Sequence, residues 1–151
     1  MENINILKKL FCFRDLTILE LAKVNTIVHT PIFKSGETVI TEGVPSHSLY
    51  VIKEGAVSVG KGGTTITSLG QGDLVGEISF LDKGEPSATV TTLEETTFIE
   101  IRGDAFEELL NGNRDLAFKI MKSVTTTLCQ RLRNADDLIA KRQLLLLPPS
   151  L

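Results

Sequence analysis

Glycine-containing turns recur at roughly ten-residue spacing through the middle of the chain, and they constrain its fold more than any other feature. These turns fall at Ser35-Gly36, Glu42-Gly43, Glu54-Gly55, Gly60 to Gly63, Gly70 to Gly72 and Lys83-Gly84. Apolar and polar residues alternate in several of the segments between them, as in Val57-Ser58-Val59. The segments expected to be strands are Thr26–Thr30, Thr38–Thr41, Ser48–Lys53, Ala56–Gly60, Thr64–Leu69 and Thr96–Ile101. Many short strands at even spacing predict a closed or nearly closed antiparallel roll.

Apolar residues at helical spacing flank the roll on both sides. Ahead of it, about residues 4–24 show this spacing, with Asp15 as the predicted N-cap of a second helical segment. After it, about residues 104–142 show the same spacing. Asp104 is predicted to cap a short helix there, and a long helix is expected to begin at Arg114.

These patterns predict a single domain over residues 1–151, a length that can bury one core. The fold class is mainly β with flanking helices: an antiparallel β-roll or jelly roll, also called a double-stranded β-helix. N-terminal helices are expected over about residues 4–24, the roll over about 26–101 and two closing helices over about 104–142.

The long helix carries an apolar stripe close to a heptad seam, formed by Met121, Val124, Leu128, Ala135 and Leu138. Arg131 interrupts this seam. Because the stripe continues past what the roll needs for cover, we predict a parallel homodimer through this helix. The alternative is that the stripe packs back on the roll of its own chain.

Between two predicted strands, the stretch Val75–Val90 reads V-G-E-I-S-F-L-D-K-G-E-P-S-A-T-V. Glu77 to Leu81 has room for only a short helix, which Asp82-Lys83-Gly84 ends. A helix start and a turn both present backbone N–H groups beside small side chains, and proteins hold anions in this way. The stretch therefore predicts an anion site, and the alternative is a tight turn that connects two strands.

Several classes of function lack support in the sequence. The formal net charge of −3 argues against general nucleic-acid binding, and no apolar run approaches the ~18 residues of a membrane span. His29 and His47 have no third partner at metal-ligand spacing, and no nucleophile motif is present. We therefore expect no enzyme activity, catalytic residue, metal or cofactor.

The two cysteines are expected to be buried free thiols. Cys12 and Cys129 are far apart and match no metal spacing. The N-terminus does not read as a signal peptide, so we predict a cytoplasmic protein.

A further set of residues runs through the roll: Gly36-Glu37, Val39, Ile40, Glu42-Gly43, Tyr50, Ile52, Gly55, Val57, Val59, Leu69-Gly70, Gly72-Asp73 and Gly76-Glu77. Together with Val75–Val90, this set resembles the cyclic nucleotide-binding domain. That module occurs in bacterial catabolite-activator-type regulators, protein kinase A regulatory subunits and gated ion channels. The resemblance covers about residues 4–142 and implies that Val75–Val90 is the phosphate-binding cassette.

The resemblance implies a role for individual residues and a ligand, cAMP or cGMP. Glu77 takes the place of the glutamate that accepts a hydrogen bond from the ribose 2′-hydroxyl. The residues implied to face phosphate or ribose are Gly76, Ile78, Ser79, Ser87 and Ala88. The long helix is implied to fold over the base and to transmit the signal, and its candidate base contacts are Asn134, Ala135 and Asp136.

Pro86 departs from the family pattern, because the usual cassette has an arginine there that pairs with the phosphate. Proline carries neither a charge nor an N–H group, and Glu85 precedes it. Removing one partner of a buried charge pair costs roughly 2–5 kcal/mol, which is about thirty- to several thousand-fold in affinity. Lys83, in the same loop, could supply a substitute charge.

Three functions follow from these features. The first is a sensory domain that binds a cyclic nucleotide weakly, or a related small ligand, and signals through the long helix to a protein partner. The second is a ligand-independent dimerisation or interaction module that has lost nucleotide binding. The third is a sensor for an uncharged or differently charged metabolite in a remodelled pocket. Transcription regulators of the family continue into a helix-turn-helix domain, but this chain stops at Leu151, so we expect no direct DNA binding and no membrane partner.

Overall fold

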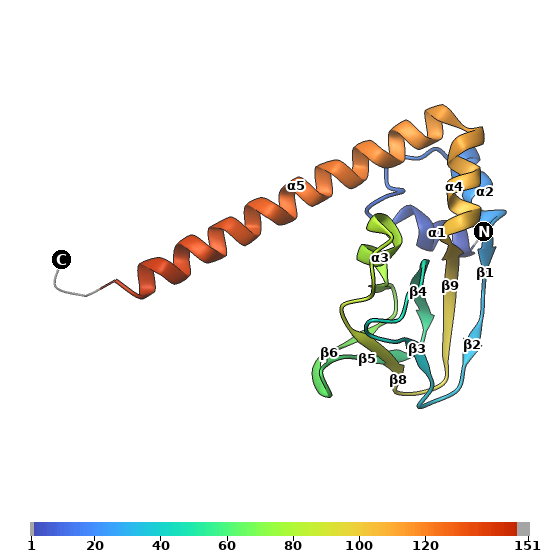
Figure 1. Cartoon of the computed structure of the whole chain (residues 1–151). Coiled ribbons are helices and arrows are strands. Elements are labelled where there is room, and N and C mark those ends of the chain that lie inside the picture. The colour runs from blue at the N-terminus through green and yellow to red at the C-terminus, as the bar shows by residue number, and fades with distance from the viewer. Residues whose placement is uncertain (1, 148–151) are drawn as a thin grey trace.

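The glycine-punctuated segments form two antiparallel sheets in a computed structural model, which describes residues 2–147 (Figure 1). The first sheet has the order β1-β9-β4-β7, with β2 also paired to β9. Its strands are Val28–His29 (β1), Ile32–Phe33 (β2), Ser48–Glu54 (β4), Leu74–Val75 (β7) and Thr96–Arg102 (β9). The second sheet has the order β3-β8-β5-β6 and contains Thr38–Ile40 (β3), Ala56–Lys61 (β5), Thr64–Gly70 (β6) and Thr89–Thr92 (β8). The predicted antiparallel roll is therefore confirmed.

The turns explain most of the strand boundaries. Gly55 joins β4 to β5 with φ +115°, and a Cβ at this position would lie 2.8 Å from Cα of Thr96. Only glycine avoids both the left-handed strain and the collision, so this residue fixes the corner of the roll. The predicted strand Thr26–Thr30 shrinks to β1, because α2 (Ile18–Asn25) continues to Asn25 and Thr26 is its C-cap.

Strand β4 contributes to two hydrophobic cores, because successive side chains of a strand point to opposite faces. Tyr50 and Ile52 point into the roll, whereas Leu49 and Val51 point toward the helices. The core inside the roll consists of Ile40, Tyr50, Ile52, Val57, Val75, Val90 and Phe98. The second core joins the outer face of the first sheet to residues of α1 (Glu2–Lys8), α2, α4 (Gly103–Gly112) and the start of α5 (Arg114–Leu145).

Two helix caps differ from the prediction. Thr17, not Asp15, caps α2: its hydroxyl accepts a hydrogen bond from the Glu20 N–H, and the Glu20 carboxylate accepts one from the Thr17 N–H. This reciprocal pair satisfies two backbone donors at once. Asp104 lies in the first turn of α4, and the N-cap residue is Arg102, whose side chain makes no capping bond.

Helix α5 is attached to the body from its start to Arg131, and the rest projects away from it (Figure 1). Its buried residues are Leu116, Ile120, Ser123 and Val124. Beside them, α5 makes three side-chain hydrogen bonds to the segment between α1 and α2 and to α2. Lys119 donates to Glu20 at 2.7 Å, Ser123 donates to Asp15 at 2.8 Å, and Thr127 accepts from Arg14 at 3.2 Å. Every described residue from Arg131 onward is exposed.

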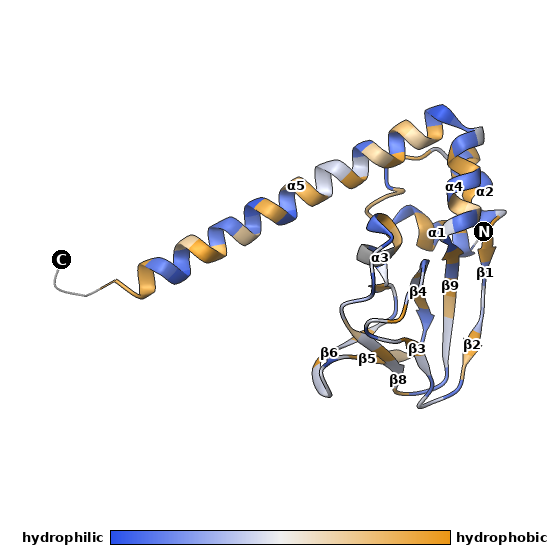
Figure 2. Ribbon diagram, in the orientation of Figure 1, coloured by the Kyte–Doolittle hydropathy of each residue, from blue (hydrophilic) through white to orange (hydrophobic). Residues whose placement is uncertain are grey.

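The apolar stripe of α5 differs from the predicted seam at one important residue. Val124 is buried against the body, so it is not available to a second helix. Seven exposed apolar residues instead follow a spacing of three and four that polar residues interrupt at Thr125 and Arg142. We call them the outer stripe: Phe118, Met121, Leu128, Leu132, Ala135, Ile139 and Leu146. Hydrophobic bands accordingly continue along the whole projecting part (Figure 2). The alternative that the stripe packs back on the roll applies to the first half of α5 and is wrong for the second.

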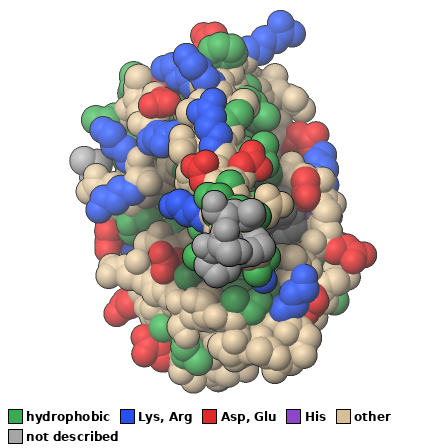
Figure 3. All heavy atoms as spheres, turned by 90° about the vertical axis from the view of Figure 1, so that its left-hand side faces the viewer, with side chains coloured by type: hydrophobic (Ala, Val, Ile, Leu, Met, Phe, Trp, Pro, Cys, Tyr) green, Lys and Arg blue, Asp and Glu red, His purple; other side chains and the backbone are tan. Residues whose placement is uncertain are grey.

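Basic side chains are distributed unevenly over the face seen along α5. Lys and Arg gather mostly in its upper half, whereas acidic side chains are scattered over both halves (Figure 3). The described residues 2–147 include no helix that is both long and apolar enough to cross a membrane.

Candidate ligand-binding site

Gly76 positions the predicted cassette at the junction of β7 and α3 (Glu77–Asp82). Its φ of +80° is left-handed, and a Cβ here would lie 2.8 Å from the carbonyl oxygen of Ser48. The backbone of β7 can therefore turn into α3 directly against β4 only because residue 76 has no side chain. Lys83 ends α3, also in a left-handed conformation with φ 59°.

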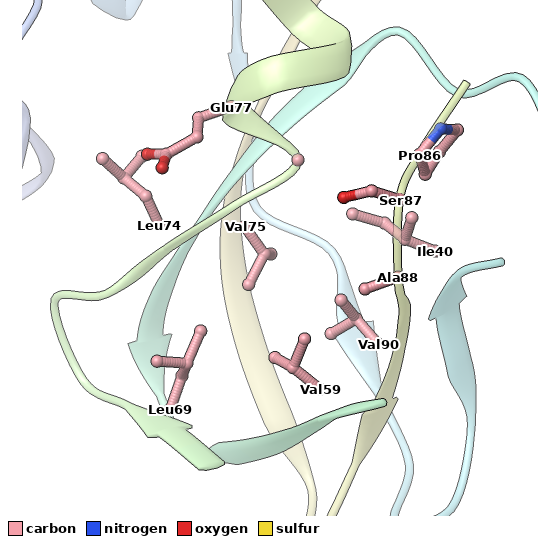
Figure 4. A pocket seen from close by; sticks show the side chains of 11 residues that line it. Ile40, Val59, Leu69, Leu74, Val75, Glu77, Pro86, Ser87, Ala88 and Val90 are labelled. Carbon is pink, nitrogen blue, oxygen red and sulfur yellow. The ribbon is translucent and has the colours of Figure 1, made fainter. Parts of the chain in front are cut away.

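The cassette borders a cavity of about 200 Å3 that opens between the two sheets (Figure 4). Five of the residues predicted from the sequence line it: Gly76, Glu77, Pro86, Ser87 and Ala88. Aliphatic side chains make up the rest of the lining, from Ile40, Val59, Leu69, Leu74, Val75 and Val90. The structure thus brings together residues that are ten or more positions apart in sequence around one hollow with apolar walls.

Two polar side chains lie on opposite sides of this cavity. Ser87 lies in the bend between Pro86 and β8, and its hydroxyl points into the space between the walls (Figure 4). The Glu77 carboxylate lies across from it, beside Leu74 (Figure 4). Ile78 and Ser79 belong to α3, but their side chains lie outside the described part of the structure, so their predicted contacts remain predictions.

The Glu77 carboxylate is bound by helix α5. Arg131 Nη1 donates a hydrogen bond to Glu77 Oε1 at 2.9 Å, and the guanidinium carbon lies 5.1 Å from the centre of the Phe11 ring. Arginine suits this place because its planar cation can pair with a carboxylate and stack on an aromatic ring together. The sequence prediction treated Arg131 only as an interruption of the seam. A charged residue within an apolar stripe was the signal that could have identified it.

The cavity contains no Lys or Arg among its described lining residues. Pro86 is buried, and Glu85 is exposed outside the lining. The Lys83 ammonium instead pairs with Glu107 at 3.0 Å, and Lys83 borders a different cavity of about 550 Å3 next to α4. Lys83 is therefore not placed to replace the missing phosphate-binding arginine, and Glu77 supplies the charge of the lining.

The candidate base contacts lie on the projecting part of α5. Asn134, Ala135 and Asp136 are exposed and belong to neither the cavity lining nor the cores. The Asn134 amide oxygen accepts a hydrogen bond from Gln130 on the preceding turn at 3.1 Å. The structure does not bring these residues to the cavity, so their contact with a base remains a prediction that requires α5 to move.

The two cysteines lie in different environments. Cys12 is buried, whereas Cys129 is exposed, so the expectation of two buried thiols is wrong for Cys129. Burial raises the pKa of the Cys12 thiol to about 12, and the nearby Glu77 carboxylate adds to the increase. A buried thiol with a raised pKa is chemically inert, in contrast to an exposed one.

The comparison with known proteins agrees with this geometry. A family profile described as the cyclic nucleotide-binding domain matches residues 31–113, which include β2 to β9, the cassette and α4. The chain belongs to the cyclic nucleotide-binding domain family. The match covers the roll and the cavity but not the projecting part of α5.

Regulatory proteins stand among the curated relatives. The chain is 29% identical over 106 residues to the cAMP-dependent protein kinase regulatory subunit of Hypocrea atroviridis, covering 70% of this chain and 23% of that protein. It is 28% identical over 112 residues to the CRP-like cAMP-activated global transcriptional regulator of Mycobacterium tuberculosis, covering 71% of this chain and 50% of that protein. The chain therefore spans half or less of the length of these relatives.

Solved structures share the fold of this cyclic nucleotide-binding domain. The N-terminal domain of a transcriptional regulator from Streptomyces coelicolor aligns with a TM-score of 0.76 at 25% identity, covering 88% of this chain and 93% of that one. The regulatory domain of Toxoplasma gondii PKA, co-crystallised with cAMP, aligns with a TM-score of 0.67 at 25% identity, covering 72% and 43%.

Proposed function

We propose that this chain is a non-enzymatic sensory domain that binds a cyclic nucleotide weakly, or a related small ligand, in the cavity beside α3. The observation that carries the proposal is that Gly76, Glu77, Pro86, Ser87 and Ala88 line one cavity. The cAMP-bound Toxoplasma relative supports a ligand of this class. We take residues 1–151 to act as one regulatory unit, and two free thiols fit a reducing, cytoplasmic compartment.

The contact between Glu77 and Arg131 supplies a route for the signal. A ribose hydroxyl that donates to the Glu77 carboxylate competes with the hydrogen bond from Arg131. Arg131 is the last residue of α5 with an ion pair to the body among those described, so its release frees the helix for a new position. Ligand binding and helix position are coupled because both use the same carboxylate.

A titration of the full chain tests the binding proposal. We expect cyclic nucleotides or their parent nucleosides to raise the thermal midpoint, since a ligand at a hundred times its Kd stabilises a fold by about 2.7 kcal/mol. Glu77→Gln should abolish the shift, whereas Glu85→Gln, which removes an exposed carboxylate outside the cavity, should preserve it. A panel in which no compound shifts the midpoint at millimolar concentration would contradict the proposal.

Hydrogen exchange tests the signalling route. Ligand should accelerate amide exchange around Arg131 in the native chain, because it loosens the hold on α5. In Arg131→Gln the exchange should already be fast and ligand should change it little, while Arg133→Gln, another exposed arginine of α5, should behave as the native chain. Equal responses of the two variants would argue against Arg131 as the link.

The second candidate function is a ligand-independent dimerisation or interaction module. The outer stripe favours it, because an apolar surface of this regularity on a projecting helix fits a second helix. A parallel homodimer through α5 is compatible with both functions. The ligand panel separates them, since only the sensory domain responds to a small molecule.

A further inference from the structure

The charges around the cavity are arranged against an anion. Glu77 is the charged member of the described lining, and it brings a carboxylate to the site. The nearby cations are already paired with carboxylates: Lys83 with Glu107 at 3.0 Å, and Arg131 with Glu77 itself at 2.9 Å. Helix α3 has six residues, so its dipole is a small compensation for the missing cation.

We propose that the cavity selects an uncharged, ribose-bearing ligand, a nucleoside, over the corresponding 3′,5′-cyclic phosphate. This inference rests on the sensory function proposed above and specifies the ligand of the same site. A cyclic phosphate would lose its hydration on entering this cavity and find no side-chain cation in return. It would also bring a second negative charge into the same cavity as the Glu77 carboxylate, and like charges repel.

The ribose of a nucleoside offers what the site can bind. A free nucleoside carries vicinal 2′- and 3′-hydroxyls, and both can donate to one carboxylate. A 3′,5′-cyclic phosphate has its 3′-oxygen in the ester and keeps only the 2′-hydroxyl as a donor. Glu77 has two acceptor oxygens, and Arg131 contacts Oε1, so a pair of hydroxyls competes with Arg131 for the carboxylate more strongly than a single hydroxyl does.

The remaining walls suit a neutral ligand. Pro86 places a buried apolar ring where the family has its phosphate-pairing arginine. The aliphatic walls fit the faces of a base or a sugar, and the Ser87 hydroxyl gives a neutral hydrogen-bonding group opposite Glu77 (Figure 4). At about 200 Å3 the cavity is smaller than the roughly 300–1,000 Å3 of common ligand sites. It therefore favours the smaller nucleoside over its phosphate.

Calorimetric titration of the full native chain decides the question without any variant. Adenosine and guanosine are compared with cAMP and cGMP, and 2′-deoxyadenosine serves as the matched control. We expect the better nucleoside to bind at least tenfold more tightly than its cyclic phosphate, and the deoxynucleoside at least tenfold more weakly than adenosine. A cyclic phosphate that binds as tightly as its nucleoside overturns the inference and leaves the sensory function standing. Absence of binding by every compound overturns both.

A charge-restoring variant gives an independent readout. Pro86→Arg should raise the affinity for cAMP or cGMP about thirtyfold or more, while the affinity for the nucleoside changes little. Glu85→Gln, which changes the neighbouring exposed residue outside the lining, should leave the native preference for the nucleoside unchanged. An arginine variant that folds, by its thermal midpoint, but gains no affinity for the cyclic phosphates contradicts the assignment of the missing charge to this position.

Discussion

Gly76 is the single residue on which the geometry of the cassette depends most. It combines a left-handed φ of +80° with a carbonyl oxygen 2.8 Å from the place of a Cβ. Gly72, four residues earlier, has a similar φ of +87° but open space around its Cα. An alanine at Gly72 would therefore cause backbone strain alone, whereas an alanine at Gly76 would cause both strain and a steric collision.

We predict that Gly72→Ala lowers the free energy of unfolding by about 1–2 kcal/mol, the cost of a left-handed alanine. Gly76→Ala should lower it by about 3–4 kcal/mol, because the collision with Ser48 in β4 forces β7 or α3 to shift. Urea denaturation measures both values. Equal losses in the two variants would mean that β7 and α3 adjust freely at Gly76.

Cys12 makes stability depend on pH in the alkaline range. Its pKa is about 12 in the folded chain against 9.0 for an ordinary thiol, because burial disfavours the thiolate. The unfolded chain therefore releases this proton first as pH rises, so the stabilising contribution is complete below pH 9 and is lost between about 9 and 12.

We expect the free energy of unfolding to fall as pH rises over this range. In Cys12→Ala this fall should be smaller, because the contribution of the buried thiol is absent. Cys129→Ala should leave the pH profile unchanged, since that thiol is exposed. A thiol reagent at neutral pH should label Cys129 in the native chain and both cysteines after unfolding. Rapid native labelling of Cys12 would show that its burial is transient.

Single residues also show what a sequence can and cannot reveal about the site. Glu77, Pro86 and Ser87 were predictable because the cassette is continuous in sequence, and its turns carry a local signature. The partner of Glu77 was not, because Arg131 lies 54 positions away and its role depends on how α5 packs. Lys83 was considered as a substitute charge because of its proximity in sequence, but in the structure it lies at the end of α3 and its ammonium pairs with Glu107.

At the scale of elements, most strands were predicted and the caps were not. Glycine turns and alternation located β3 to β6 and β9 to within about two residues of their observed ends. Asp15 and Thr17 both have acceptor side chains near the start of α2, and Glu20 three residues after Thr17 is the capping-box pattern that could have identified Thr17 as the cap. The partner of Asp15 was not predictable, because Ser123 of α5 reaches it only through tertiary structure.

The same limit applies to α5. Its length was predicted well, from Arg114 to about Arg142 against the observed Leu145. Two overlapping stripes share Met121, Leu128 and Ala135, and the heptad pattern alone does not distinguish them. Burial of Val124 against the body assigns one stripe to the chain itself and leaves the outer stripe for a partner.

We predict that Leu132→Glu prevents the parallel homodimer, because it places a carboxylate at the middle of the outer stripe, where Leu132 is 64% exposed. Sedimentation velocity should then report the mass of one chain, 16.5 kDa, where the native chain reports twice that mass. Gln130→Glu introduces the same charge on the opposite side of the helix and should leave the dimer intact. A native chain that sediments as a monomer at high concentration would contradict the proposed partner.

For the whole molecule, the important fact is that α5 takes part in both functional surfaces. Its first half closes the second core, and Arg131, just beyond the middle of the helix, pairs with Glu77 of the cavity lining. Its second half carries most of the outer stripe. The relatives of this chain place the same kind of domain in kinases and in transcriptional regulators, which are at least twice its aligned length. Under the signalling route proposed above, such a domain would report on its cavity through one helix.

The way α5 is attached allows its free end to move like the end of a lever. The three hydrogen bonds at Lys119, Ser123 and Thr127 fix its first half to the body, and Arg131 makes a further contact beyond them. From Arg131 to Leu145 the helix runs for roughly 20 Å at about 1.5 Å per residue, so a tilt of about 10° at Arg131 displaces Leu145 by roughly 3–4 Å. Under the signalling route proposed above, a movement of α5 at Arg131 therefore becomes a larger displacement at the far end of the helix.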